Sequence, residues 1–386
     1  MSAIRPYDAK EITRFVDSVI RPAAVLCDEE GLMPPETIAS LASNGYLSAT
    51  FPRQYGGLEW DALEYGMLTE QIGKACSSAR TLLTIQTSLV GESLLRFGSS
   101  QQKEQWLPAI AKGKSLGAFA LSEPGAGTNP QELTTTYRLN QDSYILTGVK
   151  KWISFGDIAD FFIVIAKDAN GKMSAFIVER GRKGLSTCPI GNMIGARGTH
   201  IAEVRLEDVV VPKENLLAKE GAGFSYVVNT ALDHGRYSVA WSALAIAQEA
   251  LDVMSAYAKE RKQLGGELGQ TPSVKAIIGD TVTQVHAARA LCLRAGQLRQ
   301  ARDEQALIET AIAKYFASKT AVQAALDAIQ VLGANGCRSG STAERLLREA
   351  KILEIIEGTS QVQQQLIGDF GLNTYGLESQ QISQYC

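Results

Sequence analysis

This sequence lacks a surplus of basic residues, clustered cysteines and long apolar runs. Its 38 Lys and Arg are outnumbered by 41 Asp and Glu, so no basic surface is expected to bind nucleic acid. The six cysteines and three histidines are scattered and include no Cys-x-x-Cys pair, so we expect reduced thiols and no metal site. No apolar run approaches the roughly 18 residues that a membrane span needs.

The first residues, MSAIRPYDAKEITRFV, mix acidic and basic side chains. They have neither the apolar run of a secretory signal nor the arginine-rich, acid-poor composition of a transit peptide. A cytoplasmic protein is therefore the expectation. The composition, 45% hydrophobic and 20% charged over 386 residues, is typical of a globular protein of two or three domains.

Apolar residues recur at helical spacing towards both ends of the chain. Between residues 8 and about 115 they stand three or four positions apart, as in Ile12, Phe15, Val16 and Val19. From about 224 to 369 the same periodicity returns in segments rich in Ala, Leu and Gln. Both regions are predicted to be helical.

The middle of the chain has the residue pattern of a β domain. Short runs rich in β-branched and aromatic residues lie at 144–147, 161–165, 175–178 and 209–211. Asp168-Ala169-Asn170-Gly171 stands between two of these runs, and its Asn-Gly pair predicts a hairpin.

The order helical, then β, then helical predicts an α+β fold and argues against the alternating strands and helices of a Rossmann domain. We predict an N-terminal helical domain at 1–115 and a middle β domain at 116–222. A C-terminal helical domain at 223–370 and a tail at 371–386 complete the chain.

Glu357 follows an apolar stretch and precedes a glycine and two hydroxyls, in Ile355-Ile356-Glu357-Gly358-Thr359-Ser360. Taken alone, a Glu-Gly pair indicates only a helix end on a solvated face. Removal of a proton beside a carbonyl group, by contrast, needs a carboxylate in a site dry enough to raise its basicity. The two isoleucines are suited to raise the pKa of Glu357 above the usual value of about 4.3.

A glycine-rich loop lies far upstream, in Phe119-Ala120-Leu121-Ser122-Glu123-Pro124-Gly125-Ala126-Gly127-Thr128. Its Gly-Ala-Gly resembles part of a dinucleotide-binding fingerprint, which requires a strand before the loop and a helix after it. Here the loop leads to more strands. We therefore reject the interpretation as a dinucleotide-binding fingerprint. A surface turn is the plain alternative.

A third segment is Lys151-Trp152-Ile153-Ser154. Trp152 and Ser154 stand two positions apart, so on a strand they would point to the same side. A buried structural tryptophan is the alternative interpretation.

In this order and at these separations, the three segments resemble the acyl-CoA dehydrogenase family. The resemblance extends from about residue 10 to residue 369. It implies a middle β-barrel, a C-terminal four-helix bundle, FAD as cofactor and an acyl thioester as substrate. Glu357 would remove the α proton while FAD takes a hydride from the β carbon. Its backbone amide would polarise the thioester oxygen, and Gly358 would let the substrate approach the backbone.

The resemblance also assigns the other site residues. Those implied to contact FAD are Phe119, Leu121, Ser122, Thr128, Trp152, Ile153, Ser154, Thr359 and Gln361. The hydroxyl of Ser154 would reach flavin N5. Substrate contacts are implied for Thr128, Asp233, Arg236 and Gly358. For Asp233 and Arg236, an exposed ion pair at a helix start is the alternative.

Four further residues are implied to reach the FAD of a neighbouring subunit: Arg261, Gln330, Gly333 and Ala334. A cofactor site built from two chains implies a homodimer or a homotetramer. An electron-transfer flavoprotein or a similar acceptor is the implied redox partner.

Within the family, the segments 235–241 and 354–358 resemble the branch that oxidises acyl groups on carrier proteins, in polyketide pathways that prepare hydroxymalonyl or methoxymalonyl extender units. An acyl-CoA dehydrogenase of fatty or branched-chain catabolism is the alternative. A flavin-binding protein of this fold without dehydrogenase activity, or a flavin monooxygenase, is a weaker rival because neither requires Glu357.

Overall fold

The computed structural model describes residues 6–376 except residue 264, and its helices come first in the chain, as predicted. The N-terminal helices are α1 Ala9–Phe15, α2 Arg21–Glu29, α3 Pro35–Ser43, α4 Ala62–Ala75, α5 Ser77–Leu83, α6 Glu92–Phe97 and α7 Ser100–Ala111. Two stretches of π-helix, η1 Val16–Ile20 and η4 Thr84–Gly91, connect some of them, and η2 Tyr46–Ser48 and η3 Arg53–Tyr55 are short 3-10 turns.

Local sequence explains where two of these helices begin. Asp61 caps α4 by accepting a hydrogen bond from the Glu64 amide, while the Glu64 side chain accepts from the Asp61 amide. Ser99 and Gln102 form the same reciprocal box at the start of α7. Such boxes satisfy amide groups that have no partner within the helix.

The predicted β region forms one sheet of eight strands. They are β1 Gly117–Ala120, β2 Thr136–Asn140, β3 Ser143–Ile153, β4 Phe161–Lys167, β5 Met173–Glu179, β6 Leu185–Pro189, β7 Ala202–Pro212 and β8 Leu216–Leu217. The strand order is β6-β7-β3-β2-β4-β5-β8, and β1 pairs with β4. The predicted hairpin at 168–171 is confirmed, because β4 and β5 pair antiparallel and Gly171 has a φ of 80°.

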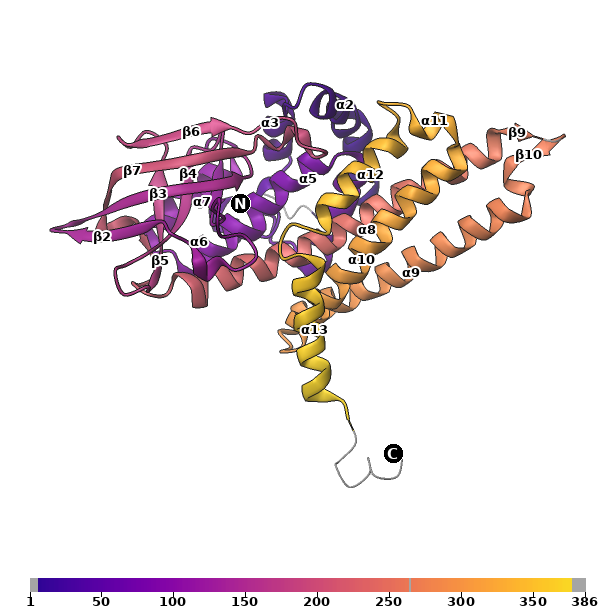
Figure 1. Cartoon of the computed structure of the whole chain (residues 1–386). Coiled ribbons are helices and arrows are strands. Elements are labelled where there is room, and N and C mark those ends of the chain that lie inside the picture. Colours follow the sequence, from indigo (N-terminus) through magenta and orange to yellow (C-terminus); the bar gives the residue numbers. More distant parts are fainter. Residues whose placement is uncertain (1–5, 264, 377–386) are drawn as a thin grey trace.

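The sheet curls around a hydrophobic core of its own. Side chains from six strands meet there, among them Tyr137, Leu146, Phe162, Phe176 and Val204. A larger core joins the opposite face of β4 and β5 to the helices before and after the sheet. The sheet therefore stands on the helical body while it closes over a separate interior (Figure 1).

Long helices dominate the C-terminal part. They are α8 Asn229–Glu260, α9 Pro272–Ala301, α10 Ala306–Leu332, α11 Ala334–Cys337, α12 Thr342–Leu353 and α13 Ser360–Thr374. The π-helix η8 Gly223–Val228 leads into α8, and a small ribbon of β9 Lys262–Gln263 and β10 Gly266–Glu267 follows it. α13 projects from the bundle (Figure 1) and stays helical to Thr374, so helix continues four residues past the predicted boundary at 370. Residues 377–386 of the predicted tail lie outside the described residues.

Ion pairs hold the N-terminal helices against the bundle. Arg289 of α9 donates to both carboxylate oxygens of Glu70 in α4, at 2.6 and 2.8 Å. Arg348 of α12 holds Asp28 of α2 in the same two-pronged way. Such pairs fix helices in orientation as well as in distance.

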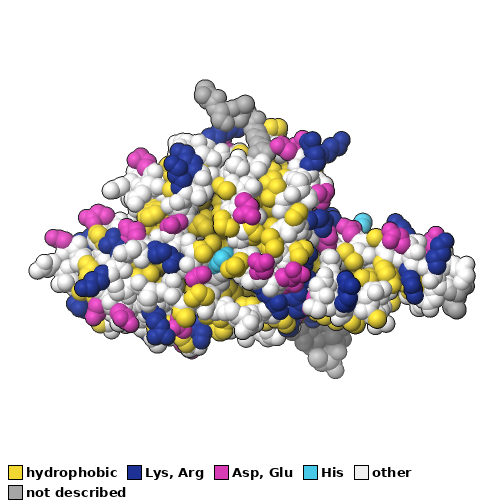
Figure 2. Space-filling model, turned by 90° about the horizontal axis from the view of Figure 1, so that it is seen from above, with side chains coloured by type: hydrophobic (Ala, Val, Ile, Leu, Met, Phe, Trp, Pro, Cys, Tyr) yellow, Lys and Arg dark blue, Asp and Glu magenta, His cyan; other side chains and the backbone are white. Residues whose placement is uncertain are grey.

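Charged residues of both signs are interspersed over the surface seen from above, and hydrophobic side chains gather near its centre (Figure 2). In the part of the chain that the structure describes, no helix is long and apolar enough to cross a membrane.

Candidate active site

Glu357 lies in the short connection between α12 and α13. Its φ is 53° and that of Gly358 is 86°, so two successive residues adopt the left-handed conformation. Glycine accepts this conformation readily, whereas glutamate is strained there, and such strain is common at functional sites. The turn directs the Glu357 side chain back towards α8.

Gly235 of α8 is what lets the carboxylate approach the helix. A Cβ atom at Gly235 would lie 2.5 Å from Glu357 Oε2 and 3.0 Å from Oε1. Oε2 is enclosed and accepts no hydrogen bond from any described residue. Burial raises the pKa of Glu357 to about 7, although the positive charges of Arg236, Lys314 and Arg80 oppose that rise.

The apolar approach expected from Ile355 is wrong. Ile355 is 55% exposed, whereas Ile356 packs against the core. The dry surroundings of Glu357 come instead from the close approach of α8. Glu357 is thus enclosed, as the sequence predicts, but only Ile356 of the two isoleucines packs against the core.

Three side chains grip the backbone around Glu357. Arg236 donates from Nε to the carbonyl of Glu357 at 3.2 Å. Lys314 of α10 donates from Nζ to the carbonyl of Gly358 at 2.7 Å, and Gln363 Nε2 donates to both carbonyls at 3.3 and 3.2 Å. These donors fix the turn that carries the carboxylate.

Lys314 and Gln363 were not predicted from the sequence. Lys314 is fully buried, and burial lowers its pKa to about 8. One signal was available: Ala311 and Ala317, three positions to either side, belong to the buried face of α10. A lysine on an apolar stripe is unusual enough to indicate a specific buried partner.

The backbone amide of Glu357 has no partner among the described residues. An unpaired N–H beside an enclosed carboxylate can donate to a carbonyl oxygen brought next to it. The arrangement thus combines a proton acceptor and a fixed hydrogen-bond donor at one residue.

The segment predicted to line the flavin is held by a buried ion pair. Glu123 accepts from Lys150 Nζ at 2.8 Å, and Lys150 also donates to the Leu121 carbonyl at 3.1 Å. Burial alone would raise the pKa of Glu123, but the ammonium of Lys150 and hydrogen bonds from Thr134 and Thr135 hold it at about 2. Both members of the pair were missed from the sequence.

This fastening brings two predicted segments together. The amide of Lys151 donates to the Ser122 carbonyl at 2.8 Å, so the end of β3 lies against the loop that follows β1. Phe119 and Leu121 are buried, Ser122 is partly buried and Thr128 is exposed.

The expectation that Trp152 and Ser154 share one side of a strand is wrong in its premise. β3 ends at Ile153, so Ser154 lies in a turn, and Trp152 has a φ of 64°, which breaks strand alternation. Trp152 is also 50% exposed, which excludes a buried structural role. A half-exposed indole beside the partly buried hydroxyls of Ser122 and Ser154 fits the planar ring of a flavin.

Thr359 and Gln361 lie on the outer side of the Glu357 turn. Thr359 caps α13, where its hydroxyl accepts from the Val362 amide at 3.3 Å. Both residues line an open pocket of about 340 Å³. The others that line it are Tyr315, Lys319, Lys351, Glu354, Ile355, Ser360 and Gln364.

The residues predicted to reach a second cofactor lie at the far end of the bundle. Arg261 follows α8, and Gln330, Gly333 and Ala334 lie exposed at the end of α10. Asn335 donates to the Tyr257 hydroxyl at 3.0 Å, and this hydrogen bond joins the end of α10 to the end of α8. From Gly235 to the end of α8 is about 38 Å at the rise of an α-helix.

Asp233 is held by an arginine. Arg299 of α9 grips its carboxylate with both terminal nitrogens, one of them at 2.9 Å, and the pair is largely enclosed. The ion pair named as the alternative for Asp233 and Arg236 therefore exists for Asp233, but it joins two helices instead of lying exposed.

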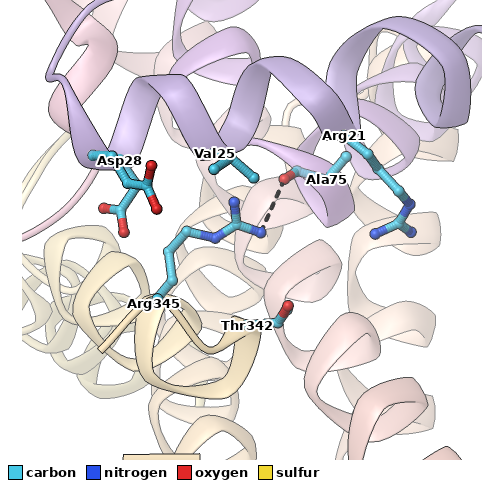
Figure 3. A pocket seen from close by; sticks show the side chains of 8 residues that line it. Arg21, Val25, Asp28, Ala75, Thr342 and Arg345 are labelled. Atoms are coloured by element: carbon cyan, nitrogen blue, oxygen red, sulfur yellow. Dashed lines mark hydrogen bonds between the residues drawn. The ribbon is translucent and has the colours of Figure 1, made fainter. Parts of the chain in front are cut away.

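A separate pocket of about 180 Å³ lies between α2 and α12 (Figure 3). Arg345 extends from α12 towards α2 and donates to the Ala75 carbonyl at 3.3 Å. None of the predicted site residues lines this pocket.

Comparison with known proteins follows the same three-part division. The N-terminal, middle and C-terminal domain models of acyl-CoA dehydrogenases match residues 9–114, 118–209 and 221–372. The short-chain specific acyl-CoA dehydrogenase of Clostridium acetobutylicum is 35% identical over 360 residues, covering 92% of this chain and 94% of the relative. Butyryl-CoA dehydrogenase from Megasphaera elsdenii has a TM-score of 0.90 at 32% identity, covering 96% and 100% of the two chains.

Two other similar structures are of proteins whose descriptions name an acyl carrier protein or a polyketide extender unit. The prolyl acyl carrier protein oxidase AnaB has a TM-score of 0.88 at 28% identity, covering 94% and 97% of the two chains. FkbI, described as serving biosynthesis of the methoxymalonyl extender unit of the FK520 polyketide, has a TM-score of 0.86 at 28% identity, covering 95% and 99%. With all three domain models matched, the chain is an FAD-dependent oxidoreductase of the acyl-CoA dehydrogenase family.

Proposed function

We propose that the protein dehydrogenates a small acyl group held as a thioester on an acyl carrier protein, with Glu357 as the base. One observation carries the role of Glu357: an enclosed carboxylate oxygen without a partner stands beside an unpaired backbone amide of the same residue. A carboxyl group with a pKa near 7 is suited to accept a proton at neutral pH.

Each contact around the turn has a part in this reaction. The amide of Glu357 donates to the thioester oxygen and so acidifies the α proton, which Glu357 then removes. Arg236 and Lys314 hold the turn, and their positive charges limit the rise in the pKa of Glu357. Ser154, Trp152 and Ser122 would hold the isoalloxazine ring of FAD, which would supply the hydride acceptor for the β carbon.

Two considerations favour a carrier protein over CoA. The segments 235–241 and 354–358 resemble the carrier-linked branch, and AnaB and FkbI have the same fold over most of the chain. A carrier also presents the pantetheine arm without an adenosine phosphate, so its protein surface can supply binding energy far from the reacting carbons. The short-chain dehydrogenases at 35% identity support the alternative, oxidation of a short acyl-CoA.

The geometry of the bundle supports a cofactor site shared between two chains. Arg261 lies about 38 Å along α8 from Gly235, and the end of α10 that carries Gln330 is joined to the same end of α8 by the hydrogen bond from Asn335 to Tyr257. Arg261 and Gln330 therefore serve the cofactor of a second copy, in a dimer or a dimer of dimers. An electron-transfer flavoprotein is the proposed acceptor of the electrons.

The base is tested with Glu357→Gln in the FAD-loaded protein. The amide preserves the shape and removes the base, so flavin reduction in stopped flow should slow ~10²- to 10⁴-fold while FAD stays bound. Reduction near the wild-type rate would remove Glu357 from this role. No bleaching of the wild-type flavin by any acyl thioester would favour a protein of this fold without dehydrogenase activity.

The carrier is tested with one acyl group on two carriers. Single-turnover reduction should be faster with a small oxygenated acyl group on an acyl carrier protein than with the same group on CoA. Equal or faster reduction with CoA, especially for plain saturated chains, would instead support short-chain acyl-CoA catabolism.

A further inference from the structure

Ser154 begins a turn that has unusual backbone conformations around it. Trp152 has a φ of 64° and Phe155 has a φ of 56°, so a residue other than glycine is left-handed on either side of Ser154. Such conformations are sparsely populated, and they persist only where the surrounding structure holds them firmly. The position of Ser154 therefore depends on what fastens this turn.

Arg180, which follows β5, fastens the turn through its guanidinium. Nη2 donates to the Gly156 carbonyl at 2.5 Å, and Nε donates to the Ala159 carbonyl. Nη1 donates to the Thr187 hydroxyl of β6 at 3.1 Å, and the guanidinium carbon lies 5.4 Å from the centre of the Phe162 ring. All three nitrogens thus donate to uncharged oxygens, two of which belong to the turn.

The loop before β7 holds the turn by a different set of groups. The amide of Phe155 donates to the Thr199 carbonyl at 2.7 Å, and the amide of Asp157 donates to the His200 carbonyl at 3.2 Å. Phe155 is also fully buried. The loop therefore binds amides of the turn, whereas Arg180 binds its carbonyls.

A guanidinium is suited to hold two carbonyls of one turn. It is planar and its donors point in fixed directions, whereas a lysine offers a single nitrogen. Arg182, two positions further along the same loop, provides a contrast. It donates to the Glu179 carboxylate and to the Val210 carbonyl, both outside the turn.

We propose that Arg180 is a positioning residue for the flavin, because it fixes the turn that Ser154 begins and so determines where the Ser154 hydroxyl meets the ring. This inference rests on the proposed function, in which Ser154 holds the isoalloxazine ring. Arg180 acts through Ser154, and Glu357 remains the base.

The test uses the FAD-loaded protein and two measurements that need no substrate. One is the rate of FAD dissociation, followed by flavin fluorescence. The other is the midpoint potential of the bound flavin, from reductive titration with a reference dye. Arg180→Met should speed dissociation by about 10-fold, the upper range for loss of one neutral hydrogen bond. It should also shift the potential in the same direction as Ser154→Ala does.

A double-mutant cycle shows whether Arg180 acts through Ser154. Ser154→Ala removes the hydroxyl and should speed dissociation to a similar extent. Residues that act through one contact have effects that do not add. Once Ser154 is alanine, Arg180→Met should therefore speed dissociation by about 2-fold or less and leave the potential where Ser154→Ala placed it.

Arg182→Met is the matched control, because it removes a partly buried arginine of the same loop whose bonds lie outside the turn. It should change neither quantity. Arg180→Lys keeps a cation that can reach one carbonyl, so it should retain part of the wild-type behaviour. If melting curves show that Arg180→Met does not fold, the same cycle with Arg180→Lys should give a smaller effect that is equally non-additive.

Three outcomes would overturn the inference. Effects of Arg180→Met and Ser154→Ala that add fully would mean that Arg180 stabilises the middle domain without acting through Ser154. Wild-type values of both quantities in Arg180→Met, or in Ser154→Ala, would remove the proposed link to the flavin. A wild-type flavin that no acyl thioester reduces would instead count against the proposed function alone, since neither measurement involves a thioester.

Discussion

The Glu357 carboxylate packs on Gly235, at a point where one added carbon would lie 2.5 Å from Oε2. The first long helix of the C-terminal domain thereby sets where the carboxylate can stand. The relationship joins residues 122 positions apart, and it gives α8 a direct part in the site.

Gly235→Ala should impair the reaction without impairing the fold. The new methyl group must displace the end of a flexible side chain, while alanine favours the helix by up to about 1 kcal/mol. A small misplacement of a reacting group costs about 10²-fold in rate. We expect a drop of that order in flavin reduction at an unchanged or higher melting temperature.

Gly279→Ala is the matched control, because Gly279 lies within α9 and no atom lies within 4 Å of a Cβ placed there. It should keep the wild-type rate. If Gly235→Ala reduces its flavin at the wild-type rate, the Glu357 carboxylate can accommodate a methyl group at this position without losing its reactive geometry.

Stability should depend on pH through Glu357. Burial raises its pKa from 4.5 to about 7 in the folded protein, so its contribution to stability is intact below pH 4.5 and is lost as pH rises through 7. Glu357→Gln does not lose stability in this way, because a glutamine side chain does not ionise. The free energy of unfolding of the variant, relative to wild type, should rise by roughly 3 kcal/mol between pH 4.5 and pH 8.

Urea titrations at both pH values with saturating FAD measure this difference. Glu104→Gln, which alters an exposed glutamate of α7, is the control. A constant difference between Glu357→Gln and wild type across this range would mean that the Glu357 carboxylate is as solvated in the folded protein as in the unfolded chain.

Lys314→Met should move the pH dependence of flavin reduction upwards. Wild-type reduction should fall below about pH 7, where Glu357 becomes protonated. Loss of the Lys314 charge removes one of the cations that oppose the rise in pKa of Glu357, so the midpoint should shift to higher pH. The measurement is the single-turnover rate from pH 5.5 to 9.

A purely structural lysine would give a different result: lower rates at every pH with an unmoved midpoint. Lys275→Met replaces an exposed lysine of α9 and should change neither quantity.

Arg261→Ala should weaken FAD retention and the oligomer together, because the guanidinium is proposed to bind the cofactor pyrophosphate of a second chain. Gel filtration with flavin absorbance measures both. Lys259→Ala removes a neighbouring exposed cation and should leave both unchanged. A fully loaded, unchanged oligomer of Arg261→Ala would indicate that Arg261 is only a solvated residue at the end of α8.

The sequence predicted the parts of the fold that local patterns encode. The order of helical and β regions and the hairpin at 168–171 follow from spacing and short motifs, whereas the three segments around Ser122, Ser154 and Glu357 were singled out by their resemblance to acyl-CoA dehydrogenases. The α+β fold was confirmed for that reason.

Contacts between distant segments could not be predicted in the same way. Arg80, Lys314 and the pair of Glu123 with Lys150 carry no local motif, because each is defined by a partner elsewhere in the chain. Trp152 and Ile355 show the complementary error: their side chains were placed by assuming regular alternation or direct burial, and tertiary packing decided otherwise.

The ion pair between Glu123 and Lys150 has a consequence for protein engineering. Its two members and the hydroxyl and amide donors around them all lie between residues 117 and 153. The ion pair is therefore fastened from inside the middle domain, whereas the start of β1 is also held by η4, because the Gln86 side chain donates to the Gly117 carbonyl at 2.8 Å and accepts from its amide at 3.0 Å. A chimaera that exchanges the middle domain as one block between relatives would carry both members of the ion pair together, whereas a crossover placed between β1 and β3 would separate Glu123 from Lys150 and could leave a buried charge without its partner.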